Sequence, residues 1–150
     1  MRVNDDYPTW NAASQVGKDD SVFAFWKRML EVRKQYDVLV MKVPLSILPM
    51  TLIRRQVYGD FALLFPEHEQ LFAYTRSLKA GTVALVIMNF SKKEVEFKGP
   101  APGTSFSWDG FEYVIGTGGT NDQSSSSLSL TAGGFVLKPY EGRLYISTSK

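Results

Sequence analysis

Beyond Val57, apolar residues recur at every second position in short runs, and this alternation constrains the fold more than any other feature of the chain. The runs are rich in β-branched and aromatic residues, and clusters of Gly, Pro, Ser or Asn separate them. They span residues 57–65, 71–78, 82–90, 94–98, 111–115, 128–130, 135–138 and 143–147. Short strands at this spacing are typical of antiparallel sandwiches and barrels. We therefore predict that residues 57–150 form one all-β domain.

Two of these runs differ in how many of their faces are apolar. Residues 83–88 are apolar on both alternations, which predicts a central strand that is covered on both sides. Residues 94–98 alternate strictly between charged and apolar side chains, which predicts a strand with one face in water.

A helical period precedes the strands. Side-chain oxygens of Asp19, Asp20 and Ser21 can pair with the free N–H groups of a helix start. Apolar residues then follow at three- and four-residue spacing: Val22, Phe25, Trp26, Met29, Val32 and Tyr36. This pattern predicts one amphipathic helix over residues 21–36, with the whole stripe, Trp26 included, packed in the core. The first 18 residues are predicted to form a loop with at most one helical turn.

Composition excludes several classes of function. The chain has 150 residues, and its 17 basic and 15 acidic side chains are spread along it, so no nucleic-acid partner is expected. No stretch approaches the roughly 20 apolar residues of a membrane span, so no membrane partner is expected either. Because the chain has no cysteine, it cannot form a disulfide or a thiolate metal site. A cytoplasmic location is the prediction that fits this best.

Catalytic, cofactor and metal sites need side chains that converge, and no such pattern stands out. His68 is the single histidine, so a turn residue is a better interpretation than a metal ligand. Glycoside hydrolysis needs two carboxylates that face each other across a cleft. The acidic pairs at residues 5–6 and 19–20 are instead adjacent in sequence. We therefore predict no catalytic residue, no cofactor and no metal in this chain.

Sugar contact is the one binding role that the residues suggest. Trp108 lies beside a predicted turn and Tyr113 follows it in the next strand. An aromatic face can stack on the apolar face of a pyranose, provided that it is exposed. If both rings face solvent in one plane, the chain could be a free-standing carbohydrate-binding or interaction module. Packing in the core is the alternative for both side chains.

Six segments, in order, carry a resemblance to a known family. They are MRVNDDY at 1–7, DSVFAFWKRMLEVRK at 20–34, VYGDF at 57–61, LFAYTR at 71–76, VIMNFS at 86–91 and LKPYEGRLYIS at 137–147. Together they closely resemble the C-terminal end of the maltase, isomaltase and oligo-1,6-glucosidase branch of the α-amylase superfamily, especially its fungal members.

The resemblance implies an architecture and a division of labour. In this family a (β/α)₈ barrel carries the active site, and an antiparallel Greek-key β-sandwich follows the last barrel helix. Residues 1–39 then resemble the end of a truncated barrel, its last loop and helix, and residues 57–150 resemble the C-terminal domain. The family's catalytic aspartates and glutamate lie in barrel segments, and no residue here matches their motifs.

The same resemblance implies a role and partners. The parent enzyme would hydrolyse terminal α-glucosidic bonds of small oligosaccharides in carbohydrate metabolism. This chain would be its non-catalytic C-terminal fragment, which packs on the barrel and stabilises it. Its partner would be that barrel, and oligosaccharide would bind only in the full-length parent. In the isolated chain the barrel-facing apolar surface, including Trp26 and Met29, would then be exposed.

Two departures from the family pattern are expected to have causes in the gene. Met1 resembles the internal methionine of the family's PWMRVN stretch, as if a gene model or a truncation began there. Residues 40–56 stand where the family runs almost directly from Val-Leu to Val-Tyr-Gly. Val codons begin with GT and Gln can be CAG, so this insert could be a retained in-frame intron. The alternative is a genuine surface insertion.

Overall fold

The computed structural model describes residues 4–40, 60–78, 81–98, 110–118, 127–128 and 134–148. The helical elements come first: α1 (Ala12–Gln15), α2 (Val22–Gln35) and the 3₁₀ turn η1 (Asp37–Leu39). The strands follow: β1 (Asp60–Leu64), β2 (Leu71–Ser77), β3 (Thr82–Asn89), β4 (Val95–Phe97), β5 (Phe111–Gly116), β6 (Ser127–Leu128), β7 (Phe135–Leu137) and β8 (Gly142–Thr148). Each predicted apolar run overlaps one of these strands.

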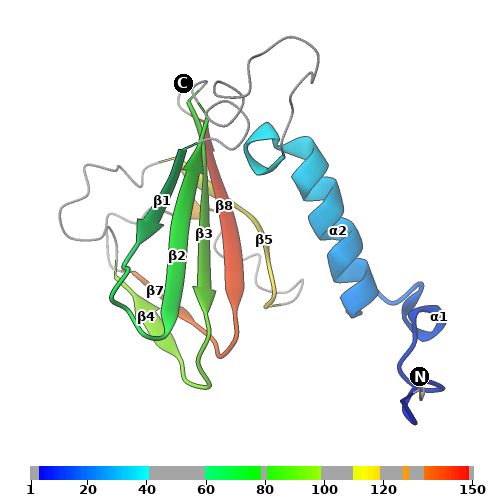
Figure 1. Ribbon diagram of the computed structural model, residues 1–150. Coiled ribbons are helices and arrows are strands. Elements are labelled where there is room, and N and C mark those ends of the chain that lie inside the picture. The colour runs from blue at the N-terminus through cyan, green and yellow to red at the C-terminus, as the bar shows by residue number, and fades with distance from the viewer. Residues whose placement is uncertain are drawn as a thin grey trace, which may run out of the picture.

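The strands form two antiparallel sheets (Figure 1). The larger has the order β1-β2-β3-β8-β5-β6, and the smaller pairs β4 with β7. The chain leaves the large sheet for β4, returns as β5 and β6, leaves again for β7 and returns as β8, which pairs with both β3 and β5. Such a return to a place between non-consecutive strands is typical of Greek-key connections. The predicted mainly-β fold, an antiparallel Greek-key sandwich preceded by one amphipathic helix, is confirmed.

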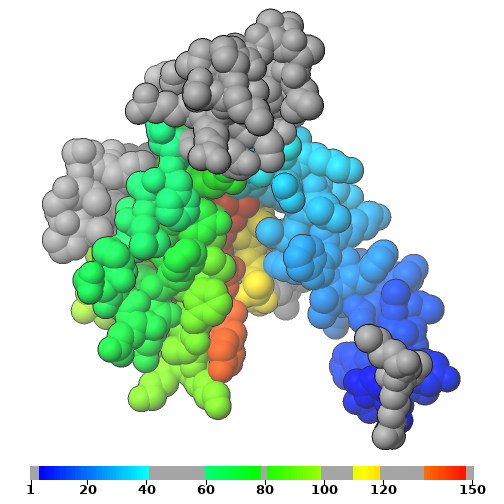
Figure 2. Space-filling model, in the orientation of Figure 1, coloured from blue at the N-terminus to red at the C-terminus, as the bar shows by residue number. Residues whose placement is uncertain are grey.

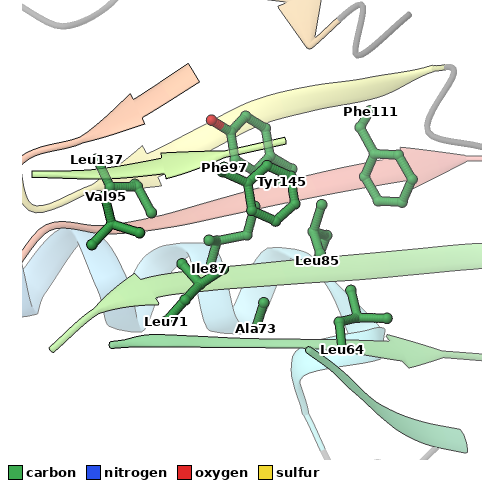
Figure 3. Packing of buried hydrophobic residues seen from close by; sticks show 10 residues of the cluster. All are labelled: Leu64, Leu71, Ala73, Leu85, Ile87, Val95, Phe97, Phe111, Leu137 and Tyr145. Carbon is green, nitrogen blue, oxygen red and sulfur yellow. The ribbon is translucent and has the colours of Figure 1, made fainter. Parts of the chain in front are cut away.

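The main core lies between the two sheets. Side chains of the large sheet point toward those of β4 and β7 (Figure 3). The cluster comprises Leu64, Leu71, Ala73, Leu85, Ile87, Val95, Phe97, Phe111, Leu137 and Tyr145. β4 follows the predicted alternation, with Val95 and Phe97 buried and Glu96 exposed. β3 lies between β2 and β8, which confirms its predicted central position.

A second core lies on the opposite face of the large sheet. There α2 and η1 pack over β3, β5 and β8. The buried members are Val38, Ala84, Ile115, Leu144 and Ile146, and the partly buried α2 residues that contact them are Phe25, Met29 and Val32, followed by Tyr36. Both faces of the central strands are therefore covered, as the apolar run at 83–88 predicts.

A β-bulge divides β5 between the two cores. Phe111 and Tyr113 contact the core between the sheets, and simple alternation would place Ile115 there too. The pairing with β8 shifts between Tyr113 and Ile115, however, so Ile115 joins Val114 on the side of α2. The extra residue of a bulge reverses the side-chain alternation that follows it.

Helix α2 is anchored at its start and only partly covered along its length. Ser21 is the N-cap, and its hydroxyl accepts a 3.1 Å hydrogen bond from the N–H of Ala24. No residue of α2 is fully buried. Trp26 is 61% exposed and Val22 is 64% exposed, so the interpretation of the whole apolar stripe as core is wrong. The exposure of Trp26 is the one expected of an isolated fragment, whereas Met29, expected to be exposed with it, packs against the core. No helix of the described residues is long and apolar enough to cross a membrane.

The predicted boundary between helix and sheet falls beside η1. Val40 follows this turn as its C-cap. The other residues of the atypical insert, 41–56, lie outside the described part of the chain.

Candidate functional site

His68 lies in the exposed turn between β1 and β2. Its Nδ1 accepts hydrogen bonds from the backbone N–H groups of Gln70 and Leu71, at 3.2 and 3.0 Å. The imidazole therefore closes the turn, in agreement with the interpretation of His68 as a turn residue. Across the described ranges, no three His, Asp or Glu side chains gather closely enough to hold a metal ion.

The acidic pairs lie on exposed turns before the two helices. Asp5 and Asp6 precede α1, where the Asp6 carbonyl accepts hydrogen bonds from the N–H groups of Thr9 and Trp10. Asp19 and Asp20 precede α2, where the Asp19 carbonyl accepts a 3.0 Å hydrogen bond from Arg28. Both pairs thus belong to helix-entry turns.

Glu141 is the one buried carboxylate among the described residues, and it is fully engaged. One oxygen accepts a 2.7 Å hydrogen bond from the N–H of Lys138, and the other lies 2.6 Å from Nε of Arg143. The Arg143 guanidinium also lies 4.8 Å from the centre of the Phe135 ring. Burial is the largest single influence and opposes its charge, but the interactions with Glu141 and Tyr145 together outweigh burial, so the pKa of Arg143 is raised above its ordinary value.

Asn89 joins the same end of the sandwich from β3. Its side-chain amide donates to the carbonyls of Lys93 at 2.8 Å, Lys138 at 2.9 Å and Leu137 at 3.3 Å. Its own N–H donates to the Glu141 carbonyl at 2.8 Å. These bonds fasten the β3–β4 turn to the end of β7. Asn89 and Glu141 thus join the two sheets at one end of the sandwich through hydrogen bonds.

Of the two residues predicted to contact sugar, the structure describes one. Tyr113 is partly buried, packs against the core between the sheets and meets the Tyr145 ring edge-on, with centroids 5.7 Å apart. Trp108 lies outside the described residues. Part of the Tyr113 ring is therefore committed to packing.

Among the described residues, a row of exposed and partly exposed apolar side chains lies on the α2 side of the large sheet and is here called the aromatic stripe. It comprises Phe61, Leu63, Phe72, Tyr74 and Phe90. The strand register places Leu63 opposite Tyr74, and ring centroids lie 5.2 Å apart for Phe61 and Tyr74, 5.6 Å for Phe72 and Tyr74 and 6.3 Å for Phe72 and Phe90. Phe61 is 58% exposed and Phe90 is 65% exposed, although both touch aromatic neighbours. An exposed row of this kind marks an interaction surface.

A hollow separates the aromatic stripe from α2, here called the α2 groove. Figure 2 shows it between the blue helix and the green strands, with β8 and β5 at its floor. Its volume is about 450 Å³. Trp26, Leu30 and Arg33 of α2 form one wall, and Tyr74 and Arg76 of β2 form the other, above a floor that includes Val86, Met88 and Leu144.

The aromatic stripe was not predicted, although the sequence carries a signal for it. In 61–64 and again in 71–74, residues on both alternations are apolar: Phe61 and Leu63 accompany Ala62 and Leu64, and Phe72 and Tyr74 accompany Leu71 and Ala73. Strands of this kind need cover on both faces. In the structure Leu64, Leu71 and Ala73 are buried on the face toward β4 and β7, whereas Phe61, Leu63 and Phe72 on the opposite face are exposed.

The chain is similar in sequence to curated α-glucosidases and oligo-1,6-glucosidases. The chain is 32% identical over 137 residues to α-glucosidase MAL32 of Saccharomyces cerevisiae, a match that covers 91% of this chain and 18% of the relative. It is 34% identical over 107 residues to an α-glucosidase of Schizosaccharomyces pombe, covering 71% of this chain and 15% of the relative. It is 28% identical over 144 residues to a probable oligo-1,6-glucosidase of Bacillus subtilis, covering 96% and 21%.

Solved structures with the same fold belong to related enzymes. Trehalose-6-phosphate hydrolase of Bacillus licheniformis matches 99% of this chain with a TM-score of 0.69 and 26% identity, over 22% of its own length. The trehalulose synthase MutB matches 97% with a TM-score of 0.68 and 23% identity, which supports the fold alone. No protein-family model matches the chain.

The chain thus spans about a fifth of the length of the curated relatives that it matches. The ordered motifs, the sandwich fold and these likenesses agree. The chain belongs to the α-glucosidase and oligo-1,6-glucosidase family of the α-amylase superfamily, as the homologue of one part of such an enzyme.

Proposed function

We propose that this chain is the non-catalytic C-terminal part of an α-glucosidase of the maltase or isomaltase type, whose sandwich packs on the catalytic barrel and stabilises it. In this proposal residues 1–39 end the barrel and residues 57–150 form the C-terminal domain. The whole enzyme hydrolyses terminal α-glucosidic bonds of small oligosaccharides. The chain's partner is the barrel.

The observation that most supports this proposal is that α2 has apolar side chains on more than one side. Phe25, Met29 and Val32 contact the sheet, whereas Phe23 and Trp26 are exposed at 44% and 61%. A helix at the surface of a free domain normally presents polar residues to water. A helix in the outer ring of a barrel has neighbouring helices on both flanks as well as strands beneath it. Apolar side chains on more than one side of α2 fit such a position.

The carboxylates support a non-catalytic role. Glycoside hydrolysis requires one carboxyl group as acid and a second as nucleophile or base, about 5 to 10 Å apart with room for the sugar between them. The buried carboxylate Glu141 is held by Arg143 and by the N–H of Lys138. The acidic pairs at 5–6 and 19–20 lie on exposed turns.

Two assays test the proposal. The purified 150-residue chain should not hydrolyse 4-nitrophenyl α-glucoside, whereas yeast MAL32 under the same conditions serves as the positive control. The chain should also co-purify with a tagged form of MAL32 from which the matching segment has been deleted, when both are expressed together. Hydrolysis by the chain alone, or failure of the two parts to associate, would contradict the proposal.

Sugar contact by Trp108 and Tyr113 stays a prediction, and it belongs to the alternative of a carbohydrate-binding or interaction module. The edge-on contact of Tyr113 with Tyr145 leaves less of its ring for stacking on a sugar. Retention on an amylose column that is lost in Trp108→Ala would favour the alternative.

The insert at 40–56 and the cytoplasmic location also stay predictions. Sequencing of the genomic locus and of spliced transcripts tests the insert: transcripts that lack these codons would identify a retained intron. Microscopy of the chain fused to a fluorescent protein tests the location.

A further inference from the structure

Strand β1 forms one end of the large sheet (Figure 1). Its five residues pair with β2 on one side, and among the described residues no strand lies on the other side. The N–H and C=O groups on the outer side can therefore accept a further strand. The other strands at sheet ends are shorter, with two residues in β6 and three each in β4 and β7. β1 is thus the longest end strand that the structure describes.

The side chains of β1 do not protect this edge. Natural edge strands usually carry a lysine, a proline or a bulge that prevents pairing with another chain. Residues 61–64 contain neither lysine nor proline, and their pairing with β2 has no bulge. Phe61 is 58% exposed and Leu63 is 44% exposed, and Ala62 between them is exposed as well. A strand added at this edge would therefore cover apolar side chains.

The order of residues in β1 suits a second copy of the same strand. In an antiparallel pair centred on Ala62, this residue lies opposite its equivalent, and Phe61 of each copy lies opposite Leu63 of the other. Directly opposed residues have Cβ atoms about 5 Å apart, so these apolar side chains would be in contact. Asp60 lies opposite Leu64 of the other copy. The two Asp60 carboxylates are then about 14 Å apart along the strands, beyond the roughly 8 Å screening length of physiological salt.

We propose that two copies of the chain pair through β1, antiparallel and centred on Ala62, and so join their large sheets into one continuous sheet. The two-fold symmetry of this pair uses the same edge of both copies and closes the assembly at a dimer. Main-chain groups at the edge of the sheet make the bonds, so the pairing goes beyond the proposed attachment to the barrel and does not depend on it. One five-residue strand from each copy is a small interface, so a weak dimer with a Kd above about 10 µM is expected.

Sedimentation velocity over a concentration range from about 5 to 500 µM tests the association. The wild-type chain should shift from monomer to dimer across this range. Phe61→Lys should weaken the association by about tenfold, because it places a charge in the middle of the pair. Val136→Lys is the matched control, at a residue that is 48% exposed on β7 of the other sheet, and it should associate as the wild type does. Circular dichroism checks that both variants fold.

A wild-type chain that stays monomeric over the whole range would overturn the proposal. So would a dimer that Phe61→Lys leaves intact. Neither result bears on co-purification with MAL32, so the proposed function is tested separately.

Mixtures of charged variants test the register. In the pair centred on Ala62, position 61 of one copy faces position 63 of the other. A mixture of Phe61→Lys and Leu63→Glu chains should therefore dimerise more strongly than either variant alone, because opposite charges then face each other. A mixture of Phe61→Lys and Phe61→Glu chains lacks this direct pair and should gain less. The reverse order of the two mixtures would exclude the proposed register.

Disulfide trapping tests the centre of the pair. The chain has no cysteine, so Ala62→Cys introduces a single thiol. Opposed residues of an antiparallel pair have Cα atoms about 4.5 to 5.5 Å apart, which a disulfide can span. Oxidation with copper phenanthroline should link Ala62→Cys chains into dimers and leave Asp60→Cys chains, with thiols about 14 Å apart, as monomers. Phe72→Cys, which is exposed on β2 in the interior of the sheet, should also stay monomeric. Equal linking at position 72 would mean that two copies meet face to face, and the proposal would be wrong.

Discussion

Nε of Arg143 lies 2.6 Å from a carboxylate oxygen of Glu141, and both side chains are nearly buried, at 12% and 3% exposed. Glu141→Ala leaves this guanidinium without its anion at the end of the sandwich. We expect the free energy of unfolding to fall by about 3 kcal/mol, the usual cost of breaking a buried pair by removing one partner. Urea unfolding followed by circular dichroism measures it.

The matched control is the exposed ion pair of Lys98 and Glu96, whose side chains are 75% and 52% exposed. Exposed pairs contribute little because water and salt screen them. Glu96→Ala should therefore change the free energy of unfolding by less than about 0.5 kcal/mol. Equal losses in Glu141→Ala and Glu96→Ala would show that burial does not distinguish the two pairs.

Asn89→Asp tests whether the β3–β4 turn is held by amide donors. The substitution keeps a side chain of the same size, but it replaces the group that donates to the carbonyls of Lys93 and Lys138. A carboxylate would face those carbonyls instead. We expect a loss of about 2 kcal/mol at neutral pH, measured by urea unfolding. Ser91→Ala, which removes one partly exposed hydroxyl partner of Asn89, should cost less.

Much of the sandwich was predictable because its strands obey simple alternation. β4 shows this most directly, since charged and apolar residues alternate there and so do exposed and buried side chains. Ile115 does not follow the alternation, because a bulge in β5 turns its side chain toward α2. The residues of β5 show no pattern from which this bulge could be predicted. Side-chain alternation therefore predicted the positions of strand residues where the strand stayed regular, as in β4.

The interaction surface escaped prediction for a different reason. Periodicity shows which apolar side chains need to be buried. It does not show whether other segments of the same chain bury them. Trp26 has the spacing of a core residue, yet it is 61% exposed. Phe61 and Leu63 likewise occupy a strand with two apolar faces, yet both are exposed, and Leu64 is the one buried residue of this strand. The pairing of β1 with β2 and the position of α2 were needed to bring these residues into one surface.

Tyr145→Phe tests the buried hydroxyl in the core. Within the described residues this oxygen makes no hydrogen bond of good geometry, although Arg143 lies close enough to interact with it, so its removal should raise stability at pH 7 by at most about 1 kcal/mol. Burial, the largest influence, raises the pKa of Tyr145 above its ordinary value of 10.0, while nearby Arg143 partly opposes the shift. A tyrosine with a raised folded pKa contributes stability that is complete below its unfolded pKa and is lost as pH rises toward the folded one.

The wild-type chain should therefore lose stability above about pH 10, and Tyr145→Phe should lose less over the same range. Urea midpoints at pH 8, 9.5 and 10.5 measure the difference. Tyr74→Phe, at a partly exposed tyrosine of the aromatic stripe, controls for removal of a phenol that is not in this core. A pH dependence that is the same in all three proteins would exclude Tyr145 as its source.

Trp26 and Phe25 are neighbours on α2 with opposite expected behaviour. Phe25 packs against the core beneath the helix, so Phe25→Ser should lower the free energy of unfolding of the isolated chain by about 2 kcal/mol. Trp26→Ser should change it by less than about 0.5 kcal/mol, because Trp26 is mostly exposed in the isolated chain. Binding to MAL32 that lacks its matching segment should instead depend on Trp26.

Trp26 forms a wall of the α2 groove, so Trp26→Ser should reduce co-purification about tenfold although the chain remains folded. A Trp26→Ser chain that is destabilised alone but binds normally would mean that Trp26 serves the fold of this domain and not its attachment to the barrel.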